Sequence, residues 1–132
     1  MQQLFTALKT KFDGDVDLSG AATGGLWLNR LEHNTTEPYI TFRLIGNIPL
    51  WIFGGTPIEA PSLHFTIVSN STSATEVCTI YGYLVALYDW CSLCVVDHAV
   101  VGMKRVNAAL EQPEEKFWEY SVFYDLLIQR RV

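Results

Sequence analysis

Three groups of residues in this sequence have types and spacings that could do chemistry, and the first is a run of aspartates. Asp13, Asp15 and Asp17 have the spacing of the first three ligands of a calcium loop, which binds Ca²⁺ through carboxylate oxygens. Such a loop also needs a glycine at its sixth position and a bidentate glutamate at its twelfth, where this sequence has Leu18 and Gly24. The pattern therefore favours a hydrated loop over a calcium site.

The second group is a Cys-x-x-Cys pair, Cys91 and Cys94, with Asp97 and His98 close behind. A structural zinc site needs four ligands, and the sequence has no second pair at zinc-like spacing. A redox-active pair sits at a helix N-terminus, where the dipole lowers the thiol pKa. This pair follows the end of a predicted helix, where the dipole has the opposite sign. The pattern favours small apolar core residues.

The third group, the histidines, is scattered. His33, His64 and His98 belong to no recognisable nucleophile or metal motif. His64 alternates with a run of apolar residues, which predicts that it lies on the other side of the sheet from the buried face. The glycines between positions 20 and 25 lack the Gly-Lys-Ser/Thr of a phosphate-binding loop. We therefore predict no catalytic residue, no cofactor and no metal ligand.

Composition narrows the class of protein. A length of 132 residues predicts one domain, residues 1–132. Only 17% of the residues are charged, while four Trp, six Tyr and seven Phe supply much apolar area. This combination favours a surface that is partly covered by other subunits. The net charge of −5 argues against a protein that grips nucleic acid, because neutralising phosphates requires clustered Lys and Arg.

The sequence also gives expectations about location. Its first residues predict an amphipathic helix instead of a signal peptide. The longest apolar stretch, residues 84–96, is interrupted by Asp89 and Ser92 and is too short to span a bilayer. We expect a cytoplasmic protein whose three cysteines are thiols, with no membrane partner.

The elements that position these groups are clearest between residues 63 and 90. Leu63, Phe65 and Ile67 alternate with more polar residues, which predicts a strand with one buried face. Ser73 and Glu76 then have the spacing of a capping box at a helix N-terminus. A stripe at three- and four-residue spacing follows and predicts a long amphipathic helix: Val77, Ile80, Tyr81, Leu84, Leu87 and Tyr88.

The rest of the chain is predicted to supply strands and one further helix. Residues 4–12 form that helix, and residues 13–25 form a loop. Strands are expected over residues 26–31, 39–45, 99–110 and 118–129, with a bend or bulge at Gly102. Gly46 and Asn47 should close the second strand, and Pro57 and Pro61 should bracket a loop. The expected fold is α+β: a largely antiparallel sheet on which an N-terminal helix and one long amphipathic helix pack.

One apolar segment suggests a contact surface. Residues 49–55 read PLWIFGG, so large apolar side chains stand between proline and glycine. Trp51 and Phe53 would point the same way on an extended segment. Either they pack on the protein's own core or they contact a neighbouring subunit, and they are the predicted interface residues.

Taken together, the layout resembles the tail terminator, or tail completion, proteins of long-tailed bacteriophages, also called head–tail joining proteins. The segments that carry the resemblance cover most of the chain: LFTALKTKF, EPYITFRLIG, FTIVSNSTSATEVCTIYGYLVALYD and WEYSVFYDLLI.

The resemblance implies a structural protein that is not an enzyme. Such proteins form rings, commonly hexamers, that cap the tail tube and join it to the head. The implied partners are other copies of the chain, the tail tube protein and the head connector or stopper protein, with genomic DNA only in transit. The implied location is the tail or neck region of a virion assembled in the host cytoplasm.

Two alternatives stay open at this point. One is a head-side connector adaptor or stopper. The other is a small ligand-binding or hydrolytic α+β domain that uses the region from Cys91 to His98.

Overall fold

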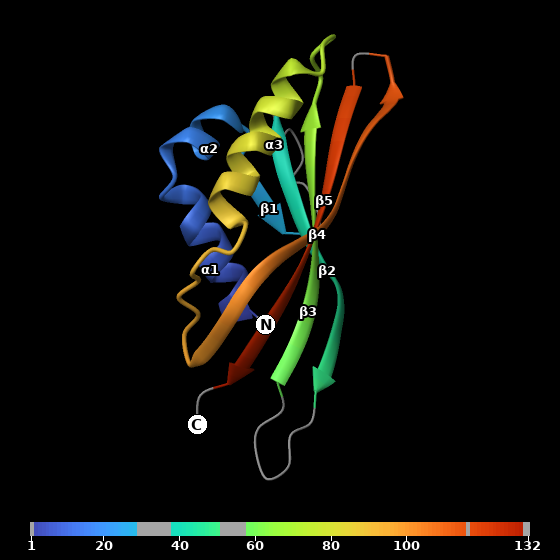
Figure 1. Ribbon diagram of the computed structural model, residues 1–132. Coiled ribbons are helices and arrows are strands. Elements are labelled where there is room, and N and C mark those ends of the chain that lie inside the picture. The colour runs from blue at the N-terminus through green and yellow to red at the C-terminus, as the bar shows by residue number, and fades with distance from the viewer. Residues whose placement is uncertain (1, 29–37, 51–57, 116, 131–132) are drawn as a thin grey trace.

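The computed structural model describes residues 2–28, 38–50, 58–115 and 117–130. Eight elements follow one another along the chain (Figure 1): α1 (Gln2–Asp13), α2 (Val16–Ala21), β1 (Leu26–Leu28), β2 (Tyr39–Leu50), β3 (Ile58–Ser69), α3 (Thr75–Tyr88), β4 (His98–Glu114) and β5 (Phe117–Arg130).

The strands form one five-stranded sheet in the order β1-β2-β3-β5-β4. Short β1 runs parallel to β2, and every other neighbouring pair is antiparallel. The prediction of an α+β fold with a largely antiparallel sheet is therefore confirmed.

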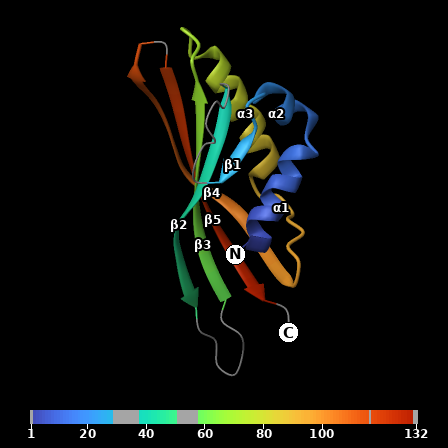
Figure 2. The ribbon, with the colours of Figure 1, turned by 180° about the vertical axis from the view of Figure 1, so that it is seen from behind.

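The helices all lie on one face of the sheet, as the two opposite views in Figures 1 and 2 show. The sheet sends one side chain of every two toward them. Leu63, Phe65 and Ile67 of β3 are fully buried, as their alternation predicts. Phe65 contacts the rings of three other elements, Phe42 of β2, Tyr88 of α3 and Tyr124 of β5, with ring centroids 5.2–5.8 Å apart. These aromatic contacts form the centre of the core.

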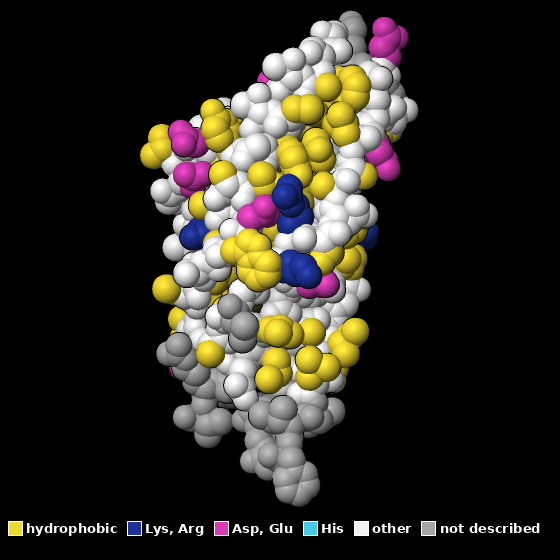
Figure 3. All heavy atoms as spheres, in the orientation of Figure 1, with side chains coloured by type: hydrophobic (Ala, Val, Ile, Leu, Met, Phe, Trp, Pro, Cys, Tyr) yellow, Lys and Arg dark blue, Asp and Glu magenta, His cyan; other side chains and the backbone are white. Residues whose placement is uncertain are grey.

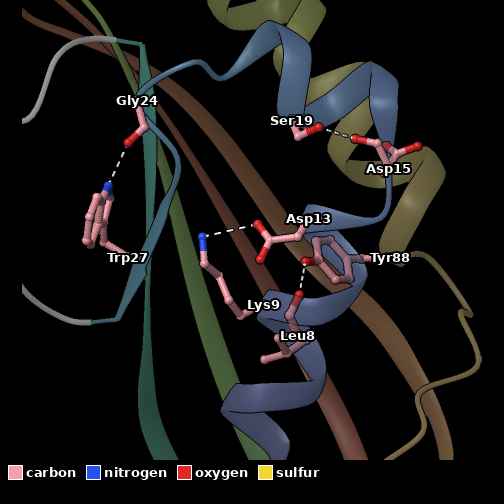
Figure 4. Close-up of polar contacts among 8 residues, drawn as sticks. All are labelled: Leu8, Lys9, Asp13, Asp15, Ser19, Gly24, Trp27 and Tyr88. Atoms are coloured by element: carbon pink, nitrogen blue, oxygen red, sulfur yellow. Dashed lines mark hydrogen bonds and ion pairs between the residues drawn. The ribbon is translucent and has the colours of Figure 1, made fainter.

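The predicted stripe of α3 is the surface that packs on the sheet. Val77, Ile80, Leu84 and Tyr88 are buried, and Tyr81 and Leu87 pack against the core while half-buried. Tyr88 also ties the two long helices together, because its hydroxyl donates a 2.8 Å hydrogen bond to the Leu8 carbonyl of α1 (Figure 4). Burial raises the pKa of this phenol far above its ordinary value, so the hydroxyl stays a donor.

The predicted loop at residues 13–25 is wrong in one respect, because it contains the short helix α2. The Asp15 carboxylate caps that helix by accepting a 3.1 Å hydrogen bond from the Leu18 amide, and the Asp15 carbonyl accepts one from the Ser19 hydroxyl (Figure 4). Leu18 is fully buried. The Asp15 cap and the buried side chain of Leu18 therefore stabilise α2, which is too short to show a helical period of apolar residues in the sequence.

The capping box predicted at Ser73 and Glu76 does not form. The N-cap of α3 is Ala74, and the Ser73 hydroxyl accepts from the Thr75 amide. The Glu76 carboxylate instead accepts a 2.6 Å hydrogen bond from the hydroxyl of Ser69, which is fully buried at the end of β3. Because a buried hydroxyl must be hydrogen-bonded, Glu76 bonds to Ser69 instead of to the backbone amides at the start of α3.

Two predicted strand boundaries are also wrong. β2 does not close at Gly46 and Asn47 but continues to Leu50, after a register shift between Leu44 and Gly46. β3 begins at Ile58, so Pro61 lies inside a strand, opposite Asn47. The pairing of β3 with β5 passes from Glu59 directly to Ser62, so the missing proline amide falls where that ladder is interrupted.

The register shift in β2 decides which way its second half faces. Ile40, Phe42 and Leu44 lie toward the helices, opposite the inward residues of β3. After the shift, Ile48 is opposite Ala60 and Leu50 is opposite Ile58, on the other face. Both side chains are therefore exposed although they continue the even-numbered apolar series.

The last two strands form a long hairpin. The bulge predicted at Gly102 is confirmed by a register shift between Val100 and Gly102, and two further shifts follow at Arg105/Asn107 and Glu111/Glu114. In β5 the predicted face is confirmed, since Val122, Tyr124, Leu126 and Ile128 are buried and Trp118 and Tyr120 pack on the core.

Candidate interaction surface

The turn that follows α3 is held by Asp89. Its carboxylate accepts a 2.6 Å hydrogen bond from the hydroxyl of buried Tyr124 and pairs with Arg105 of β4 at 3.3 Å. The Arg105 guanidinium also donates to the Tyr81 hydroxyl. Burial, followed by the bond to Asp89, raises the pKa of Tyr124 well above its ordinary value. The end of α3, β4 and β5 are thus connected through the Asp89 carboxylate and its partners.

This anchored turn holds Trp90 outward. The Trp90 backbone has φ 54°, a left-handed conformation that is costly for any residue with a Cβ. The conformation is held by the Trp90 amide, which donates a 2.8 Å hydrogen bond to the Met103 carbonyl of β4. The indole is nevertheless 72% exposed. A large aromatic side chain kept at the surface by a strained turn is typical of a contact residue.

Beside Trp90 lies a hollow of about 340 Å³. Trp90 stands against Gly102, where an added Cβ would meet the indole at 3.6 Å. Besides Trp90 and the buried Leu126, the hollow is lined by three apolar residues of the open face of the sheet, Ile48, Ala60 and Leu127. Ile48 is 65% exposed, so this apolar surface is available for contact.

The rim of the hollow carries charge. Lys104 of β4 and Asp125 of β5 lie opposite each other in the register, and both line the hollow. Asp125 accepts a 2.8 Å hydrogen bond from the Ser62 hydroxyl, while Lys104 is in no ion pair among the residues described. The rim therefore carries charges of both signs, and Arg105, the next residue along β4, is paired with Asp89. Figure 3 shows Lys and Arg side chains beside hydrophobic ones at the middle of the molecule.

The other half of the open face is polar and includes His64. Arg43 Nε donates to His64 Nδ1 at 3.3 Å, so Nδ1 is an acceptor, and Nε2 carries the proton and donates to Thr66 Oγ1 at 3.2 Å. The imidazole stacks on Phe123 at 4.3 Å. Burial, followed by the charge of Arg43, lowers the pKa of His64. His64 therefore lies opposite the buried face, as predicted, and is a neutral, fully bonded side chain.

The region from Cys91 to His98 brings no reactive group together. Cys91 is half-buried against the core with its sulfur 3.9 Å from that of Met103, and burial raises the pKa of its thiol. Cys94 is exposed, so its predicted role as a core residue is wrong. In the segment after α3 its two neighbours, Leu93 and Val95, pack on the core instead. His98 Nδ1 donates to the Val96 carbonyl at 2.8 Å.

The three aspartates are divided among separate tasks. Asp13 pairs with Lys9 at 3.3 Å, and Asp15 caps α2 (Figure 4). Asp17 is exposed in the first turn of α2. Over the described ranges, no three His, Cys, Asp or Glu side chains lie in a group that could hold a metal ion.

Other predicted residues lie outside the described part of the chain. Trp51 and Phe53, the predicted interface residues, are among them, as is His33. Among the helices described, none is long and apolar enough to cross a membrane.

Sequence reasoning missed Trp90. Trp90 stands in an apolar run that begins within α3, and helical periodicity alone does not distinguish it from the buried residues of that run. A usable signal was its place directly after Asp89, since an acidic residue at a helix C-terminus opposes the helix dipole and so suggests another role.

Comparison with known proteins gives a likeness of fold. No protein-family model matches the chain, and no curated protein matches it in sequence. A chain of the virion of a native gene transfer agent (GTA) particle superimposes with a TM-score of 0.80, at 7% identity, over 94% of this chain and 92% of that one. A second solved chain, which has no descriptive name, matches with a TM-score of 0.59 at 12% identity over 95% and 94%. At these identities the likeness establishes a shared fold.

Proposed function

We propose that this chain is a structural protein of a bacteriophage or phage-like particle and that it acts as a tail terminator. In this role copies of the chain form a ring, as a hexamer, that caps the tail tube and joins it to the head. The observation that carries the proposal is the fold likeness to a chain of a gene transfer agent virion, which spans more than nine-tenths of both chains. The segments that resemble the tail terminator family point the same way.

The surface of the protein supports a role in contacts. Exposed apolar side chains occur on the open face of the sheet, at Ile48, Leu50 and Leu127, and at Trp90 beside it. The polar groups around them are bonded to one another and are not poised for reaction. We therefore propose that the protein is not an enzyme and works through the shape of the assembly.

The proposed partners are other copies of the chain, the tail tube protein and the head connector or stopper protein. Genomic DNA would pass through the ring, and a net charge of −5 would keep it from adhering. The protein would lie in the neck region of a virion assembled in the host cytoplasm. Trp51 and Phe53 are proposed as contacts between subunits, since the strand end that leads to them already exposes Ile48 and Leu50.

The test is to purify particles from cells that carry the gene and from cells that lack it. Detection of the protein at the head–tail junction by labelled electron microscopy, with unjoined heads and tails in its absence, is the expected result. Its absence from purified particles would overturn the structural role. Its presence on isolated heads, with none on isolated tails, would overturn the tail terminator assignment in favour of a head-side adaptor or stopper.

Trp51→Ser and Phe53→Ser variants test the proposed subunit contact. We expect both to reduce joined particles, while Trp27→Ser, a control on β1, does not. Joined particles at the natural level in both variants would show that these two residues make no necessary contact.

A further inference from the structure

We propose that residues 91–97 form a strap that opens as a unit while the sheet and the helices stay folded. The strap joins the end of α3 to the start of β4, and it runs beside α1 in both opposite views (Figures 1 and 2). It is a conformational device of the single chain, so the proposal goes beyond the assembly role proposed above and does not depend on it.

The strap has few backbone hydrogen bonds to the rest of the domain. The Cys91 amide donates to the Tyr88 carbonyl at 3.2 Å, and the Val95 carbonyl accepts from the His98 amide at 3.2 Å. In the described part of the chain, no backbone hydrogen bond of the strap reaches further than these flanking residues. The strap can therefore leave its place without breaking a strand ladder or a helix.

Left-handed residues mark the two ends of the strap. Trp90, just before it, has φ 54°, and Asp97, its last residue, has φ 61°. Among the residues described, they are the two non-glycine residues with positive φ, and this conformation is costly for any residue with a Cβ. Opening lets Asp97 relax, which offsets part of the cost of opening. Trp90 stays tied to the Met103 carbonyl through its amide, so the strap hinges at this end.

Side-chain packing keeps the strap closed. Val95 is buried in the core, while Cys91 and Leu93 are half-buried against it. The other four residues are exposed: Ser92, Cys94, Val96 and Asp97. Val95 is thus the main anchor, and the free energy that its burial contributes opposes the conformational entropy that the seven residues regain on opening.

Space for the movement lies on the side of α1. A hollow of about 620 Å³ lies between that helix and the strap, lined by Thr6 and Thr10 among others on α1 and by Leu93 and Val96 on the strap. Close packing along this length would hold the strap against the helix, and the hollow shows that such packing is missing. The strap can therefore move without displacing α1.

Hydrogen exchange of single amides, followed by NMR on the purified natural chain at low urea concentrations, tests the proposal. The probes are the amides of Cys91 and His98, whose hydrogen bonds lie at the two ends of the strap. The reference is the set of slowest amides of β3, the central strand. We expect both probes to exchange at least about a hundredfold faster than the reference. Their exchange should also depend less on urea, because opening the strap exposes less surface than global unfolding.

Two valine variants show whether the strap opens as a unit. Val95→Ala weakens the anchor that opening releases, so it should speed exchange of both probes together, by about tenfold. Val122→Ala is the matched control, since this valine of β5 is also buried but stays in the core when the strap opens. It should lower the urea midpoint of global unfolding and leave the two probes unchanged. Circular dichroism checks that each variant is folded.

Three results would overturn the proposal: probes that exchange at the rate and with the urea dependence of the reference, a Val95→Ala variant that leaves either probe unchanged, or a Val122→Ala variant that speeds the probes as much as Val95→Ala does. None of these bears on the presence of the protein in purified particles. Conversely, a protein absent from particles overturns the proposed function while leaving the measured opening as it stands.

Discussion

Replacing Asp89 by alanine tests whether one carboxylate holds the turn between α3 and β4. In the natural protein this carboxylate accepts from the Tyr124 hydroxyl at 2.6 Å and pairs with Arg105 at 3.3 Å. The substitution leaves the hydroxyl of a fully buried tyrosine without its partner. It also removes the fixed start of the segment that carries Trp90.

The expected loss of stability can be worked from these two contacts. A hydrogen bond to a charged group stabilises by about 1.5–3 kcal/mol, and an unsatisfied buried hydroxyl cannot recover this from water. The ion pair adds less than about 1 kcal/mol, because the side chains of Arg105 and Asp89 are 36% and 28% exposed. We expect Asp89→Ala to lower the free energy of unfolding by about 2–4 kcal/mol.

Urea unfolding followed by circular dichroism measures this change, and a double-mutant cycle with Tyr124→Phe isolates the hydrogen bond. The coupling between the two substitutions should be about 1–2 kcal/mol. Asp125→Ala is the matched control, since that aspartate makes an exposed hydrogen bond with Ser62 and should cost less than about 1 kcal/mol. A loss from Asp89→Ala no larger than that of the control, or a coupling near zero, would refute the reasoning.

Three further predictions concern the core, the open face and the thiols. Phe65→Ala should lower the free energy of unfolding by about 3–5 kcal/mol, because it empties the centre of the aromatic core, and Phe123→Ala on the open face should cost clearly less in the same urea titration. Because the pKa of His64 is lower in the folded state than its ordinary value of 6.5, the unfolded chain binds more protons below that pH, so stability should fall as the pH drops through this window. The urea midpoint of His64→Gln should depend less on pH, and equal dependence would contradict the assignment. A thiol reagent should modify exposed Cys78 and Cys94 quickly and Cys91 slowly, because Cys91 is half-buried with a raised pKa; a Cys91→Ser variant that loses a fast phase would contradict this.

The core was largely predictable from the sequence, because burial follows local periodicity there. Leu63, Phe65 and Ile67 alternate without interruption, and the α3 stripe repeats over more than three turns, so each pattern specifies one buried face. The predicted α+β class follows from these elements alone.

The candidate surface was not predictable, because it depends on register and on one backbone conformation. Ile48 continues the apolar series of β2, yet the shift between Leu44 and Gly46 turns it to the open face. The glycine at this shift has the same residue type as a strand end, and the sequence predicts a strand end there. Trp90 belongs to an apolar run, and only its left-handed backbone and the bond to Met103 turn it outward. The start of α2 is a similar case, since six residues are too few to show a helical period.

The three register shifts in β4 have a consequence for how copies of this protein can meet. β4 is at an edge of the sheet and is 17 residues long, and a straight strand of that length would be a template for fibrous aggregation. Each shift breaks the alternation and twists the strand, and the Trp90 amide occupies the Met103 carbonyl. A foreign strand therefore cannot extend the ladder along the whole edge. The shifts thus protect the protein from open-ended strand pairing between copies when it accumulates in a cell. Copies can then associate only through contacts between side-chain surfaces, which have a limited area.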